Sequence, residues 1–143
     1  MHSKIKGGIG VSKVCSFFLN KEIPCFGELF CDMSDCDLII ETDIGLKTIQ
    51  VRTTTSNNKE TADLRLRSVT PGTRKTPCVI KRCGENVDIF ALYIDDMDKI
   101  LFIDNKDIKK LGNTAVFRFT EPKNNQKKNC RMAKEYTTPS FMK

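Results

Sequence analysis

Hydrophobic and polar residues alternate with two different periods along the chain. Near the N-terminus, four apolar residues follow the i, i+3, i+4, i+7 spacing of one helical face: Val11, Val14, Cys15 and Phe18. We expect this helix to end near residues 20–21, ahead of Pro24, because proline disfavours a continuing helix. The preceding GGIG lacks the spacing and the Lys-Ser/Thr of a phosphate-binding loop, so we expect a flexible entry to the helix.

The rest of the chain is dominated by short runs with the period of a β-strand. Strands are predicted over residues 23–30, 37–42, 48–54, 62–67, 87–94, 100–103 and 116–119. Residues 69–77 hold two prolines and a glycine and predict a loop, whereas residues 108–111 and 124–135 predict a helical turn and a polar surface helix. One helix followed by several antiparallel strands and short helices indicates a single α+β domain over residues 1–143, with the helix on a mixed sheet.

Basic and acidic residues are concentrated in different segments of the chain. The net charge is +6, from 24 basic and 18 acidic residues. Residues 84–107 carry seven carboxylates, whereas residues 47–82 and the stretch 121–143 are basic. Separate basic segments suit a polyanion such as nucleic acid, although ordinary solvated surface is the plainer interpretation. No apolar run has the length needed to cross a membrane or the form of a signal peptide, so we expect a soluble intracellular protein.

Seven cysteines are many for a chain of this length. Their odd number, without a secretion signal, favours reduced thiols over a disulfide framework. Cys31/Cys36 and Cys78/Cys83 share one spacing and could form the two halves of a zinc site. The alternative is that cysteine serves here as a small core residue.

The predicted hairpin of residues 37–54 carries a group of side chains suited to phosphate chemistry. Gln50 and Arg52 lie on one face of its second strand, and Asp37 opens the first strand. A carboxylate, an amide oxygen and the backbone carbonyl after Gln50 could bind one Mg²⁺, and a nearby cation could stabilise charge on a phosphate under attack. Such a pattern also arises by chance, so a structural role stays open on these residues alone.

The segments KGGIGVSKVCSFFLNKEIPCFGELFCDMSDCDLII and KTIQVRTTT resemble the small PD-(D/E)XK nuclease family that includes a tetrameric group I intron homing endonuclease. VDIFALYIDDMDKILFID and FRFTEPKNNQKKNCRMAKEY are similar to later parts of that family, in the same order. The resemblance implies a restriction-endonuclease-like core and a Mg²⁺-dependent endonuclease that cuts double-stranded DNA as a homo-oligomer, a dimer or a tetramer. It implies metal binding by Asp37 and Gln50, and places Arg52 where the family has its catalytic lysine.

Two positions depart from the family pattern. Arg52 keeps the positive charge of lysine but does not readily lose a proton. Val11 stands where the family has a glutamate that assists the metal. Glu22, Glu28 and Asp35 are neighbouring carboxylates, and Lys47 is an alternative lysine that strict alternation puts on the other face of the strand. The sequence therefore leaves two functions open, a DNA-cutting enzyme and a catalytically degenerate module that binds DNA without cutting it.

Basic residues on and beside the predicted loop are the candidate DNA contacts. Phosphate contacts give affinity whether or not the bound strand is cut. The residues are Arg65, Arg67, Arg74, Lys75, Lys81 and Arg82. The alternative for several of them is a role in solubility. Two interpretations also stay open for the C-terminal stretch, which could extend the DNA surface through Lys127, Lys128 and Arg131 or pack on the core through Met132 and Tyr136.

Overall fold

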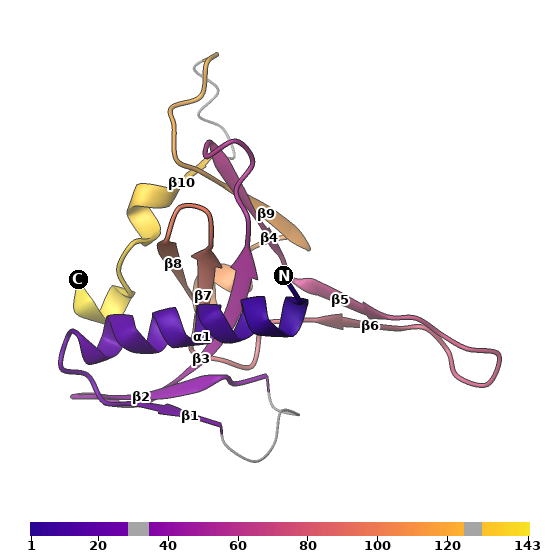
Figure 1. Cartoon of the computed structure of the whole chain (residues 1–143), viewed down its shortest axis with the longest axis horizontal. Coiled ribbons are helices and arrows are strands. Elements are labelled where there is room, and N and C mark those ends of the chain that lie inside the picture. The colour runs from indigo at the N-terminus through magenta and orange to yellow at the C-terminus, as the bar shows by residue number, and fades with distance from the viewer. Residues whose placement is uncertain (29–34, 125–129) are drawn as a thin grey trace.

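The computed structural model of the chain describes residues 1–28, 35–124 and 130–143. Two α-helices, ten strands and two 3₁₀ helices occur in these residues (Figure 1). In chain order they are α1 (Ser3–Leu19), β1 (Cys25–Gly27), β2 (Leu38–Thr42), β3 (Gly45–Thr54), β4 (Thr61–Arg65), β5 (Arg67–Thr70), β6 (Val79–Arg82), β7 (Ile89–Ile94), β8 (Lys99–Asp104), α2 (Asn105–Ile108), β9 (Thr114–Arg118), β10 (Arg131–Met132), η1 (Ala133–Tyr136) and η2 (Ser140–Met142).

A five-stranded mixed sheet organises the molecule. Its strand order is β1-β2-β3-β7-β8, and every pairing is antiparallel except that of β3 with β7. Helix α1 lies across one face of this sheet (Figure 1). A second sheet, in the order β10-β9-β4, covers part of the other face, and β5 pairs only with β6 among the described strands. The predicted α+β architecture with a mixed sheet is therefore confirmed.

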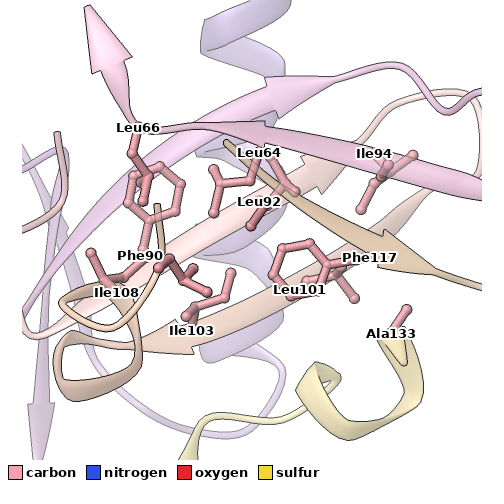
Figure 2. Packing of buried hydrophobic residues seen from close by; sticks show 13 residues of the cluster. Leu64, Leu66, Phe90, Leu92, Ile94, Leu101, Ile103, Ile108, Phe117 and Ala133 are labelled. Carbon is pink, nitrogen blue, oxygen red and sulfur yellow. The ribbon is translucent and has the colours of Figure 1, made fainter. Parts of the chain in front are cut away.

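Two apolar clusters hold these layers together. One lies between α1 and the sheet, where Val14 and Phe18 of the helix contact Ile40, Ile49 and other inward residues. The other lies between β7–β8 and the second sheet. Figure 2 shows its residues, most of which come from the two sheets. Strand β7 has all six residues buried, alternating between the two clusters, as a central strand covered on both faces requires. The long buried strand predicted at residues 87–94 is thus the centre of the fold.

The N-terminal helix is longer than its pattern predicted. Helix α1 begins at Ser3 and includes the whole GGIG stretch, so the expectation of a flexible entry is wrong. Gly10 is buried, and a Cβ at this position would meet the Thr53 side chain and lie 3.6 Å from the Tyr93 Cβ atom. The absent side chain lets the helix approach the sheet closely, which offsets the low helix propensity of glycine.

Two further expectations are corrected. Residues 69–77, predicted to be a loop, belong in part to a two-stranded hairpin: β5 extends to Thr70 and β6 returns from Val79. We call residues 67–82 the arm, which projects away from the body of the molecule (Figure 1). The surface helix predicted at residues 124–135 is wrong in the described part, where residues 131–132 form β10 and a 3₁₀ helix follows.

The C-terminal stretch departs from a helix because its apolar residues pack on the core. Ala133 is buried, and the Tyr136 ring stacks edge-on against Phe117 with 5.0 Å between ring centroids. The interpretation that Tyr136 packs on the core is confirmed, whereas Lys127 and Lys128 lie outside the described residues. Within the described residues, no helix combines the length and the apolar character that a membrane crossing needs.

Gly10→Ala is expected to lower the free energy of unfolding by about 1–3 kcal/mol, because the new methyl group overpacks the contact between helix and sheet. Gly8→Ala is the matched control, since a Cβ there meets nothing within 4 Å. That change should raise stability by about 1 kcal/mol through helix propensity. Urea denaturation of both variants measures the difference, and equal effects at the two positions would contradict the close approach.

Candidate active site

Asp37 is bound to the residues on both sides of Gln50. Its backbone N–H donates to the Ile49 carbonyl at 2.8 Å, and its Oδ2 accepts the Val51 N–H at 2.7 Å. Strand β2 begins one residue later, so the Val51 N–H is bound by the Asp37 carboxylate and not by a backbone carbonyl of β2. The turn of the β2–β3 hairpin, where Gly45 adopts a φ of +119°, sets the register that brings these positions together.

Gln50 presents a buried oxygen that lacks a donor. Its side chain is 7% exposed, and its Oε1 atom accepts no hydrogen bond from residues 1–28, 35–124 or 130–143. Ile49 and Val51 point toward α1, so alternation directs Gln50 to the opposite face of β3. Leaving an amide oxygen buried and unpaired costs free energy, and such an atom calls for a role that the apoprotein does not supply.

Arg52 brings a positive charge to the same place. Its Nη2 atom donates to the Cys83 Sγ at 3.0 Å, which ties β3 to the chain just after the arm. The guanidinium is also close enough to lower the pKa of Asp37 and of Asp35. The backbone therefore brings Asp37 next to the β3 segment that carries Gln50 and Arg52, along the edge of β3 that lies beyond the start of β2. That the three side chains meet at one point, and their chemical roles, stay predictions.

The pKa of Asp37 lies above its ordinary value. Partial burial is the largest cause, and the nearby Glu28 and Asp35 carboxylates add to it, against the Val51 N–H and Arg52, which lower it. Because the folded pKa exceeds the unfolded one, this group favours folding less as the pH rises through those two values. Folding thus forces together negative charges that a cation would neutralise.

The oxygen atoms at this edge suit a hard divalent cation. Backbone groups of even-numbered β3 residues point to β7, as the bond from the Asp88 N–H to the Thr48 carbonyl shows. Those of Ile49 and Val51 therefore point to the β2 side, where Asp37 lies. The donor set consists of one carboxylate, one amide oxygen and one carbonyl, which fits Mg²⁺ with retained waters. In the described part of the chain, no three His, Cys, Asp or Glu side chains form a metal cluster.

A cleft of about 450 Å³ begins beside Arg52 and runs between the end of β3 and the edge of β4. Its polar lining includes Thr54, Asn57, Asp63 and Arg65. A larger recess of about 690 Å³ lies at the turn end of the β2–β3 hairpin and contains none of the predicted site residues. The cleft at Arg52, although smaller, is the one that continues the candidate site.

Four of the six predicted DNA contacts are exposed and form no ion pair with any residue that the structure describes. Arg65 ends β4 and lines the cleft, Arg67 opens β5, and the other two lie in the exposed tip of the arm at residues 74–75. The arm carries five basic residues and no acidic one between residues 67 and 82. It therefore presents a positive two-stranded ribbon beside the candidate site.

The remaining two predicted contacts have partners within the protein. Arg82 donates through Nη2 to the Ile108 and Leu111 carbonyls at 2.8 and 2.6 Å, and its Nε lies 2.7 Å from Glu85. This side chain joins the base of the arm to the C-terminal end of α2, so we assign it a structural role. Lys81 forms an ion pair with Asp35, with 2.9 Å between Nζ and Oδ1.

The other sequence-based candidates lie away from this edge. Lys47 pairs with Ile40, whose side chain faces α1, so it lies on the face of β3 opposite Arg52, as alternation predicted. Val11 packs against the apolar cluster under α1 and supplies no ligand. The zinc hypothesis stays a prediction, because Cys31 lies outside the described residues; the buried Cys83 accepts the Arg52 hydrogen bond.

Sequence reasoning named Asp35, with Glu22 and Glu28, as a carboxylate that could compensate for the low charge of the metal ligands, but it gave Asp35 no contact. Its pKa is lowered, first by the hydrogen bond from Lys81 and then by the charge of Lys81, a hydrogen bond from Asn86 and the charge of Arg52, against partial burial. The partners Lys81 and Asn86 are 46 and 51 positions later in the sequence. No local signal could have identified this contact.

Comparison with known proteins gives a consistent result. A model of the PD-(D/E)XK endonuclease family matches residues 1–139. Among solved structures, the chain is similar to the bacterial homing endonuclease I-Ssp6803I, with 17% identity and a TM-score of 0.76 over 95% of this chain and 88% of that one. At this identity the likeness shows the fold, which is the restriction-endonuclease-like α+β fold that the sequence resemblance implied. No curated protein matches the chain.

Gln50→Met is expected to raise the free energy of unfolding of the metal-free protein by about 1 kcal/mol, because it removes a buried unpaired oxygen at nearly constant volume. Thr48→Val is the control, because the Thr48 hydroxyl bonds to Asp88 at 3.1 Å and its loss should lower stability. Denaturant titration compares them, and destabilisation by Gln50→Met would mean that the amide is satisfied.

Proposed function

Because the chain belongs to the PD-(D/E)XK endonuclease family, we propose that it is a Mg²⁺-dependent nuclease that hydrolyses phosphodiester bonds of double-stranded DNA. The observation that carries the proposal is the buried Gln50 oxygen, which accepts no hydrogen bond from the described residues, one position before the Val51 N–H that binds the Asp37 carboxylate. An amide oxygen in this state is costly to keep in a purely structural role, and it becomes useful when a cation completes its bonding.

Each side chain at the edge has a part in the proposed reaction. Asp37, Gln50 and the Val51 carbonyl would hold the cation, and the bond from the Val51 N–H keeps the carboxylate oriented. Bound Mg²⁺ would polarise the scissile phosphate and lower the pKa of a water molecule. Arg52 stays protonated, so it would act by donating to phosphate oxygens and by stabilising the negative charge of the transition state.

The arm and the cleft supply the surface for the substrate. A two-stranded ribbon has dimensions that the major groove of DNA admits. Arg67, Arg74, Lys75 and Lys81 of the arm would meet phosphates on either side of the groove, with Arg65 extending the contact along the cleft. The chain presents one candidate centre in its described residues, so cutting both strands would require a second copy. We therefore include a homo-oligomer, a dimer or a tetramer, in the proposal.

A DNA-binding module without cutting activity is the second candidate. It is favoured by the hydrogen bond from Arg52 to the Cys83 thiol, which occupies part of the guanidinium that phosphate would need. Both functions share the fold and the basic surface, so only the fate of the bound DNA separates them.

Plasmid DNA is expected to be nicked or linearised in the presence of Mg²⁺ or Mn²⁺ and to stay intact with EDTA. Asp37→Ala should lower the cleavage rate by more than about 100-fold while DNA affinity is kept, because it removes a charged metal ligand. Glu41→Ala, which removes an exposed carboxylate of β2, is the control and should cleave normally. Binding without cleavage by the unaltered protein in either metal would establish the non-cutting module.

Replacing Arg74 and Lys75 together by Ala is expected to flatten the dependence of DNA affinity on salt. The slope of log K against log[salt] should fall by up to about two units, because two phosphate contacts are lost. The control pair is Lys21, two residues after the end of α1, and Lys143, the last residue. The end of α1 and the C-terminus both lie at the opposite side of the molecule from the arm (Figure 1). Fluorescence anisotropy over a range of salt concentrations measures both slopes, and an unchanged slope for the arm pair would remove the arm from the interface.

A further inference from the structure

The metal ligands assigned above carry little charge for a magnesium site. Asp37 contributes one negative charge, and one of its two oxygens already accepts the Val51 N–H. Gln50 and the Val51 carbonyl are neutral, and Val11 contributes no oxygen. Divalent-cation affinity depends strongly on the number of charged ligands, so this set alone predicts weak binding.

Asp35 is a second carboxylate within electrostatic reach of this edge. It lies two residues before Asp37, and its charge raises the pKa of the Asp37 carboxyl. The charge of Arg52 in turn lowers the pKa of Asp35. Its side chain is 24% exposed, so it is held at the protein surface rather than extended into solvent. Asp35 and Asp37 are therefore two carboxylates just before the start of β2 that act on each other electrostatically, and the buried Gln50 oxygen belongs to the β3 segment that Asp37 contacts.

Lys81 forms an ion pair with the Asp35 carboxylate. The 2.9 Å ion pair joins the β6 strand of the arm to the residue that precedes the metal edge. The Lys81 side chain is 57% exposed, and exposed ion pairs of this kind contribute little stability. A divalent cation or a DNA phosphate can therefore replace one partner of the pair at small cost.

We propose that Asp35 is a further ligand of the metal site, and that Lys81 and the divalent cation compete for its carboxylate. The inference deepens the proposed function and rests on it. In the free protein the ion pair keeps Asp35 away from the cation and lowers metal affinity. When DNA phosphates attract the Lys81 ammonium, the Asp35 carboxylate is released and the second charge joins the site. Metal and DNA then strengthen each other's binding, as thermodynamic linkage requires.

Binding of Mn²⁺ to the full chain without DNA tests the competition, with free Mn²⁺ followed by electron paramagnetic resonance. Lys81→Met should tighten binding about fivefold, the scale of one exposed ion pair. Asp35→Asn should weaken it about tenfold, because a charged ligand is lost. Lys75→Met removes the same charge from the same arm without an ion pair, and it should change the affinity less than Lys81→Met does.

The double variant separates competition from a general charge effect. If Lys81 acts through Asp35, adding Lys81→Met to Asp35→Asn should change the affinity no more than Lys75→Met does in the same background. Equal effects of Lys81→Met and Lys75→Met in the unaltered protein would overturn the proposal. All these side chains lie at the surface, and circular dichroism checks that each variant is folded.

Asp37→Ala distinguishes the failure of this inference from failure of the proposed function. Loss of Mn²⁺ binding in Asp37→Ala with unchanged binding in Asp35→Asn would overturn the role of Asp35 and leave the metal-dependent nuclease standing. Unchanged binding in both variants would overturn the metal site itself. Loss in both variants, with tightening by Lys81→Met, is the result that we expect.

Discussion

The hydrogen bond from the Val51 N–H to the Asp37 carboxylate is the constraint on which the candidate site depends. It fixes an acidic side chain at the point where β2 has not yet begun and β3 still offers unpaired backbone groups. The start of β2 is therefore offset from β3, and the Val51 backbone N–H bonds to a side chain instead of to a neighbouring strand. A longer β2 would fill the same edge with ordinary strand pairing and remove the site.

The site is kept at a cost to the stability of the metal-free protein. The buried Gln50 oxygen has no hydrogen-bond partner in the described part of the chain, and Asp37 has a raised pKa because burial and two other carboxylates disfavour its charge. The rest of the molecule compensates through two apolar clusters that share the wholly buried strand β7. Local disadvantage at a place where polar groups converge is typical of functional sites.

Local pattern was sufficient for the parts of the structure that local interactions decide. Alternation located the β2–β3 hairpin, the face shared by Gln50 and Arg52, and the central strand β7, because burial of one face imposes a period of two. It did not predict that Gly10 lies inside the helix, because the side chain that requires a glycine there is Thr53 of β3. It failed again for the bonds of Arg82 to Ile108 and of Asp35 to Lys81, which join residues 26 and 46 positions apart. The two prolines and the glycine predicted a loop over residues 69–77, and this prediction hid the arm's strands, which pair residues 67–70 with residues 79–82.

The parallel pairing of β3 with β7 has a consequence for the order in which the molecule assembles. The β2–β3 hairpin closes over a turn of a few residues, whereas β3 and β7 join across the whole arm and β4. Contacts of high sequence separation form slowly, because a long stretch of chain must be confined before any of them is made. Asp37 and Gln50 can thus become neighbours early in folding, but the hydrophobic layer that buries Gln50 is completed only after β7 has been synthesised.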